Sequence, residues 1–144
     1  MDHPHASALQ LEWATLQRDH ERHETNALWI KLAAVGLAAL AALYALPLEE
    51  VAPLLLVTWV MEAMARTVQA RLGERILKVE TLIADDASPL AACQLHTEWL
   101  AGRPGAAGLL AEYARAALKP TVAFPHAFLL ILQVCLAVQG SPQV

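Results

Sequence analysis

Residues Ala27 to Leu46 read ALWIKLAAVGLAALAALYAL, a run of 20 residues with one charged side chain, Lys31. At about 1.5 Å per residue, a helix of this length crosses the roughly 30 Å of hydrocarbon in a bilayer. Lys31 lies near the start of the run, from where a lysine can reach the headgroups. Trp29 and Tyr44 lie near the two ends, where aromatic belts form. The stretch predicts a transmembrane helix over 27–46.

A second apolar stretch, VAPLLLVTWVMEAMARTV, covers 51–68 after the short connection PLEEVA. Pro53 is acceptable there because a first helical turn does not need its N–H. Apolar residues continue at helical spacing beyond the stretch. We therefore expect a transmembrane hairpin whose second helix leaves the membrane and runs on to about residue 84.

The third apolar stretch, TVAFPHAFLLILQVCLAV, covers 121–138 and is just long enough to span a bilayer. Pro125, His126 and Gln133 interrupt it. A helix that began only at Pro125 would be too short, so a re-entrant or buried helix is the alternative.

The polar parts of the chain predict further helices. Residues 6–26 form a helix of their own or extend the first span, with a heptad-like seam at Leu9, Trp13, Leu16, His20, His23 and Ala27. Ser88 and Pro89 are a favourable N-cap and N1 pair for a helix to Ala101. A second short helix follows the turn GRPG and ends at about residue 118, so that 89–118 is a helical segment.

Composition and charge placement agree with a membrane protein. Hydrophobic residues make up 57% of the 144 residues and charged residues 17%, against about 45–50% and 25% in soluble domains. The ten Lys and Arg residues lie at or before the start of the first span or within 66–119. By the positive-inside rule the N-terminus and residues 66–120 are cytosolic, and the C-terminus lies on the opposite side. We predict one all-α membrane domain, 1–144, with three transmembrane helices and a small cytosolic helical region, in the bacterial inner membrane.

Polar residues inside the predicted spans are the first candidate site. Lys31, Glu62 and His126 lie at similar depths near the cytosolic face, and Gln133 lies deeper in the third span. A charged group within a bilayer usually faces a partner. The cluster could be an ion or proton site. It could also be a structural staple of the helices, or Lys31 could simply extend to the interface.

Small residues and histidines supply the other candidates. Ala34, Ala38 and Ala42 form a small-xxx-small stripe for close helix packing, within the hairpin or against a partner. His20, His23 and Glu24 could bind a metal on one helix face, but zinc needs more ligands than this, and a solvated charged stretch is the plainer interpretation. His126 is the one histidine within a span, which is thin support for haem. We expect no cofactor.

The function that these features favour is not catalytic. A net charge of −4 makes nucleic acid a poor partner, and no catalytic motif is present, so we expect no enzyme. We expect an accessory subunit or scaffold of a larger membrane complex. The alternatives are a self-assembling pore or channel-like effector and a metal- or haem-carrying accessory protein. The expected partners are the lipid bilayer and either further copies of the chain or other membrane subunits.

The layout of residues 5–84, a cytosolic helix followed by a two-span hairpin and a long cytosolic helix, resembles that of the SLATT domains of bacterial nucleotide-signalling immunity systems. The resemblance is one of layout, with no shared residue motif. It implies a pore-forming effector. The third apolar stretch departs from the simplest version of that pattern.

Overall fold

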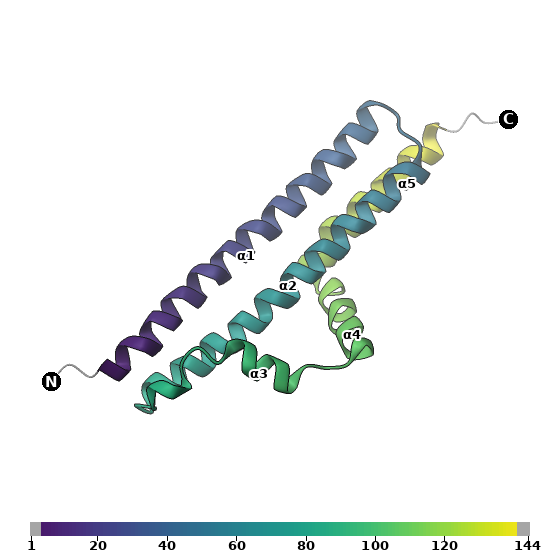
Figure 1. Ribbon diagram of the computed structural model, residues 1–144. Coiled ribbons are helices and arrows are strands. Elements are labelled where there is room, and N and C mark those ends of the chain that lie inside the picture. Colours follow the sequence, from purple (N-terminus) through teal and green to yellow (C-terminus); the bar gives the residue numbers. More distant parts are fainter. Residues whose placement is uncertain (1–3, 141–144) are drawn as a thin grey trace.

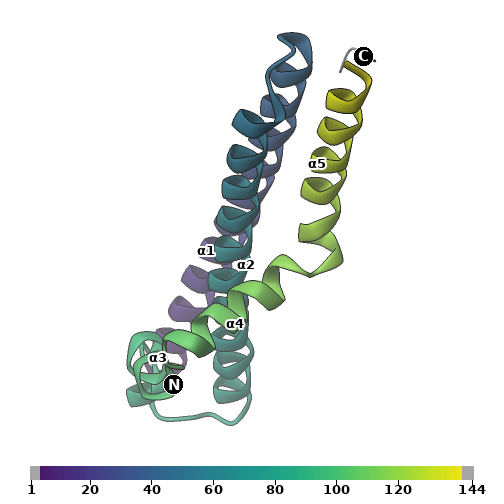
Figure 2. The same cartoon turned by 90° about the vertical axis from the view of Figure 1, so that its right-hand side faces the viewer.

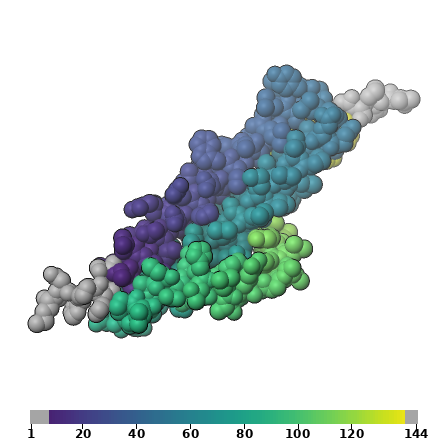
Figure 3. Space-filling model, in the orientation of Figure 1, coloured from purple at the N-terminus to yellow at the C-terminus, as the bar shows by residue number. Residues whose placement is uncertain are grey.

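The computed structural model describes residues 4–140, which are helical nearly throughout and contain no strand. Helices α1 (Pro4–Leu43) and α2 (Leu48–Ala84) form a long antiparallel hairpin (Figure 1). Helix α5 (Pro120–Gly140) runs beside the half of the hairpin nearest its turn (Figure 2). Three short elements, η1 (Pro89–Ala91), α3 (Leu95–Gly102) and α4 (Ala106–Ala117), lead from the far end of α2 back to α5. They cover the half of α2 remote from the turn (Figure 3).

Three of these helices are long and apolar enough to cross a membrane, namely Ala8–Leu43, Leu48–Ala84 and Pro120–Gln139. The prediction of an all-α chain with three helices of spanning length is confirmed for residues 4–140. The third helix begins at Pro120, five residues before Pro125, and keeps its full length. Residues 1–3 and 141–144 of the predicted domain 1–144 lie outside the described residues.

Helix α1 is a single helix of 40 residues, about 60 Å long, so residues 6–26 are continuous with the apolar stretch that follows and do not form a separate helix. Leu9, Leu16 and Ala27 of the predicted seam are buried, and its other three members are partly buried. Ala34 and Ala41 continue the alternation of three and four residues towards the turn, and both are buried. One seam therefore follows α1 along its length.

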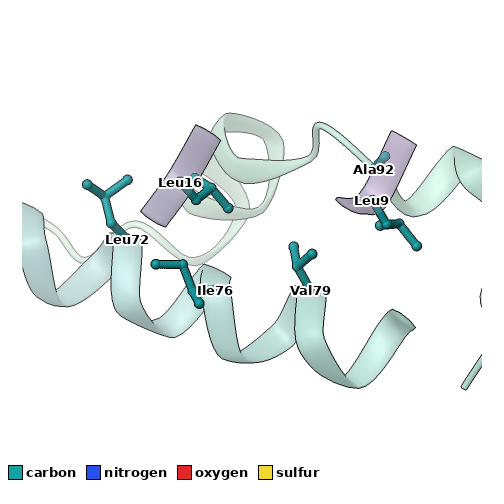
Figure 4. Close-up of a cluster of buried hydrophobic side chains, with 6 residues drawn as sticks. All are labelled: Leu9, Leu16, Leu72, Ile76, Val79 and Ala92. Atoms are coloured by element: carbon teal, nitrogen blue, oxygen red, sulfur yellow. The ribbon is translucent and has the colours of Figure 1, made fainter. Parts of the chain in front are cut away.

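Two apolar clusters hold the hairpin together, one in each half. In the half remote from the turn, Leu9 and Leu16 of α1 pack on Leu72, Ile76 and Val79 of α2, together with Ala92 (Figure 4). In the half near the turn, the cluster contains mostly small or branched side chains from all three long helices: Ala34, Ala38, Ala41, Val51, Leu55 and Leu129. Alanines on α1 let the other helices approach closely there.

The first helix ends at Leu43, three residues before the predicted end of the span at Leu46. The Leu46 N–H donates to Ala41 O at 3.0 Å, and Ala45 adopts a left-handed φ of 49°. These are the features of a Schellman motif, which satisfies the last carbonyl groups of a helix. The left-handed position usually holds glycine, and here alanine occupies it.

The predicted helix over 89–101 is broken in the structure. Ser88 caps it as expected, with its side chain accepting a hydrogen bond from Leu90 N, but a 3-10 turn ends at Ala91 and α3 begins only at Leu95. Side chains from the hairpin bind the backbone in between. Arg75 Nη2 donates to Ala91 O at 2.9 Å, and Cys93 N donates to Glu12 Oε2 at 2.8 Å. At the break, hydrogen bonds to Arg75 and Glu12 therefore satisfy the backbone groups of Ala91 and Cys93.

Candidate functional site

The side chain of Glu62 is the centre of a polar cluster that joins all three long helices. Its exposed fraction is 0%. On one side Lys31 Nζ of α1 lies 3.1 Å from Oε1, and on the other His126 Nε2 of α5 lies 2.9 Å from Oε2. Arg66 Nε, one turn along α2, is 3.8 Å from Oε1. The contacts of Lys31 and Arg66 are ion pairs at Oε1, which accepts no hydrogen bond from residues 4–140.

His126 is as deeply buried as Glu62, with an exposed fraction of 0%. Its ring stacks on Trp59, with centroids 6.0 Å apart and planes 8° from parallel. Nδ1 lies 3.5 Å from Thr58 Oγ1, while Nε2 faces the Glu62 carboxylate. An ionised carboxylate only accepts hydrogen bonds, so Nε2 is the ring nitrogen placed to donate to it. Both ring nitrogens thus face protein groups, which makes His126 a poor fit for an axial ligand of haem.

Lys31 has a second partner that explains how α5 tolerates Pro125. A proline has no N–H, so it leaves the carbonyl four residues earlier without its helical hydrogen bond. That carbonyl belongs to Thr121, and Lys31 Nζ donates to it at 3.0 Å. The lysine therefore forms an ion pair with the buried carboxylate of α2 and donates a hydrogen bond to the carbonyl that Pro125 frees in α5.

Gln133 of the predicted cluster lies two turns further along α5 and has a separate contact. Its exposed fraction is 5%, and Nε2 donates to Ala38 O of α1 at 2.7 Å. The structure therefore brings Lys31, Glu62 and His126 together and places Gln133 in a second contact between α1 and α5. In both places a polar side chain connects different helices.

The predicted alanine stripe needs a correction at its third member. Ala34 and Ala38 are buried against α2 and α5, but Ala42 is exposed and Ala41 is buried in its place. At about 100° per residue, Ala41 is rotated only about 20° from Ala34 around the helix, whereas Ala42 is rotated about 80°. A strict spacing of four therefore turns away from the packing face.

The predicted metal ligands do not form a site. The described residues contain no group of three or more His, Cys, Asp or Glu side chains placed to hold a metal ion. His20 faces α2, where its Nε2 lies close to Gly73, and Glu24 lies 3.9 Å from Arg66 Nη1. Of the three predicted ligands His20, His23 and Glu24, His20 therefore packs against α2 and Glu24 forms an ion pair.

The sequence interpretation missed a buried ion network in the half of the hairpin remote from the turn. Arg75 of α2 is 3% exposed and donates from Nε and Nη2 to the two oxygens of Glu12, at 2.9 and 3.1 Å. Its Nη1 donates to Glu98 of α3 at 3.0 Å, and Lys78 Nζ donates to the other Glu98 oxygen at 2.6 Å. The hydrogen bond from Lys78 and the charge of Arg75 outweigh burial and lower the pKa of Glu98. The network fastens α1, α2 and α3 together.

A signal for this network was present in the sequence. Glu12 lies between Leu9 and Leu16 of the seam, and Arg75 lies between Leu72 and Ile76 of the apolar stripe on the next helix. Opposite charges at core-facing positions of two antiparallel helices predict a buried pair, because a buried charge requires a partner.

Comparisons with known proteins found no match: no protein-family model, no curated protein and no solved structure matches this chain.

Proposed function

We propose that the protein is a non-catalytic integral membrane protein, an accessory subunit or scaffold that presents a helical arm to a larger complex. In this proposal α1, α2 and α5 cross the bacterial inner membrane. The N-terminus and residues 66–120 lie in the cytosol, and the C-terminus lies on the opposite side. The cation distribution and the length and apolar character of the three helices support this arrangement.

The arm is the observation that carries the proposal. Beyond their apolar stretches, α1 and α2 continue side by side as residues 4–26 and 69–84, which corresponds to about 35 and 24 Å of helix. The apolar cluster of Figure 4 and the Glu12–Arg75 contacts hold the two helices together there. Such a paired extension, fixed to the spans without a break, suits a rigid docking platform.

Exposed leucines on the arm offer anchors for another protein. Leu11 of α1 is 70% exposed, Leu77 of α2 is 64% exposed, and Leu90 of η1 is 85% exposed. Their positions are outside the predicted spans, so lipid tails would not cover them. Burial of such apolar side chains against a partner would be favourable.

The inward position of the polar cluster favours a scaffold over a pore. A pathway between subunits needs polar groups on an outer face of each subunit. Glu62, His126 and Gln133 are instead buried between helices of one chain. The outer faces of the apolar stretches carry exposed large apolar side chains such as Leu32, Val60 and Ile131, which suit lipid.

Co-purification from native membranes tests the proposal. The chain would be extracted in mild detergent, and native mass spectrometry would determine the mass of the resulting complex. We expect a heteromeric complex that is weakened when Leu77 is changed to Asp. A matched control, Glu74→Asp, changes another exposed side chain of α2 and should leave the complex intact.

Two results would contradict the proposal. A stable lone monomer from native membranes would argue against any subunit role. A symmetric homo-oligomer that makes liposomes permeable to ions would instead support the pore.

A further inference from the structure

We propose that a crevice between α1, α2 and the α4–α5 junction binds the headgroup of an anionic phospholipid. The crevice has a volume of about 380 Å³, and its polar lining consists of His20, Glu24, Arg66, Gln69, Lys119 and Thr121. The inference rests on the membrane placement proposed above, and the experiment below separates the two.

The first support is the depth of the crevice relative to the apolar stretches. Arg66 lies near the end of the apolar stretch 51–68 of α2, and Lys119 directly precedes Pro120, where the apolar helix α5 begins. Both cations thus lie where apolar helix gives way to polar chain, which is the level of the headgroups in an inserted protein. Basic pockets between transmembrane helices at the cytosolic side are suited to lipid headgroups.

The second support is the hydrogen-bonding capacity left in the crevice. Lys119 is exposed, and its ammonium has no ion-pair or hydrogen-bond partner within residues 4–140. Arg66 directs Nη1 to Gln69 Oε1 at 2.7 Å, and its buried Nε faces Glu62 Oε1 at 3.8 Å, so Nη2 is the nitrogen without a hydrogen-bond or ion-pair partner among the described residues. A lysine and an arginine that both retain donors and line one crevice match the several acceptor oxygens of a phosphate.

The charges nearby are not all positive, and their positions matter. Glu24 is 3.9 Å from Arg66 Nη1 and has a side chain that is 66% exposed, so it lies towards the open side. Glu62, which does not line the crevice, is already paired with Lys31 and His126. Lys119 also lines a neighbouring crevice, in which Arg71 and Arg115 lie together with Glu74 and Glu112. Within the proposed site the two cations, Arg66 and Lys119, outnumber the one carboxylate, Glu24, and favour a lipid with net negative charge over a zwitterionic one.

The test compares phosphatidylglycerol with phosphatidylcholine, titrated in turn into the full chain in detergent micelles. Native mass spectrometry would count the bound lipids. We expect phosphatidylglycerol to bind more tightly, and Lys119→Gln to weaken its binding about fivefold, the effect of one cation near a membrane surface. Lys119→Gln/Arg66→Gln should lower it further. Arg18→Gln removes an exposed cation of α1 outside the crevice and should leave binding unchanged.

The outcomes distinguish this inference from the proposed function. If the protein stays in cell membranes after a carbonate wash but binds both lipids equally, the lipid site is wrong and the membrane placement stands. If carbonate releases the protein, both are wrong. If inorganic phosphate displaces phosphatidylglycerol at equal concentration, the crevice binds a soluble anion, and the lipid assignment is overturned. If Lys119→Gln binds phosphatidylglycerol as the parent chain does, the site lies elsewhere.

Discussion

Replacement of Glu62 by leucine should loosen the contacts among α1, α2 and α5. Leucine has a similar volume, but it removes the carboxylate that Lys31 and His126 both approach, at 3.1 and 2.9 Å. After the change, His126 keeps its fully buried position but loses the acceptor for Nε2. Lys31 is 23% exposed at its side chain and can turn towards the surface.

These contacts set the expected magnitude. Removal of one partner from a buried ion pair costs about 3–5 kcal/mol. Lys31 can recover solvation, and hydrogen bonds between membrane helices average only about 0.6 kcal/mol. We therefore expect Glu62→Leu to lower the free energy of unfolding by about 2–3 kcal/mol, mainly because the buried imidazole of His126 loses its hydrogen-bond partner.

A double-mutant cycle shows whether the loss comes from the ion pair. Lys31→Met combined with Glu62→Leu removes both charges, so neither charged group is left without its partner. The double variant should be at least about 1 kcal/mol more stable than the sum of the single changes predicts, because interacting residues are not additive.

Unfolding by sodium dodecyl sulfate in mixed micelles, followed by far-ultraviolet circular dichroism, would measure these differences. Met61→Leu is the matched control, since Met61 precedes Glu62 and is 51% exposed. The control should be close to neutral. If Glu62→Leu were as stable as Met61→Leu and the cycle were additive, the cluster would not hold the helices together, and the reasoning would be refuted.

Three further predictions concern the arm and the turn. Arg75→Met leaves the buried Glu12 carboxylate without its bidentate partner and should lower the free energy of unfolding by about 3–5 kcal/mol. Amide hydrogen exchange should then become faster throughout α3, and unchanged exchange there would contradict this prediction. Ala45→Gly should raise the melting temperature, because it removes left-handed strain of about 1–2 kcal/mol at the cost of some chain entropy, whereas Ala39→Gly inside α1 should lower it. The lowered pKa of Glu98 means that its pairing stabilises α3 above pH 4.5 and that this contribution is lost as the pH falls through the lower folded pKa. Amide protection factors in α3 should therefore fall in that range, and a Glu98→Gln variant that shows the same fall would exclude this cause.

The alanine stripe illustrates how local spacing can mislead. A spacing of four predicted Ala34, Ala38 and Ala42, while the structure uses Ala41 in place of Ala42. The seam over 9–27 alternates spacings of three and four residues, and its continuation along α1 reaches Ala41. The face that a helix presents depends on its contacts along the full length, so the longer pattern was the better guide.

The break between η1 and α3 could not be derived from local preferences. Ser88 and Pro89 correctly predicted where the segment begins, but the backbone at Ala91 and Cys93 bonds to Arg75 and Glu12. Those two side chains are distant in sequence. Nothing within 89–101 encodes the interruption.

The sequence alone determined the all-helical class and the three apolar helices, because helix length and hydropathy are properties of contiguous residues. It also identified Lys31, Glu62 and His126 as polar residues that needed partners, since a charge in an apolar segment is costly. The tertiary structure decided which partners they have. Only the packing of three helices places Lys31 between the Glu62 carboxylate and the Thr121 carbonyl that Pro125 leaves free. Such contacts depend on the rotation and offset of one helix against another, and these are set by all the side chains along the interface together.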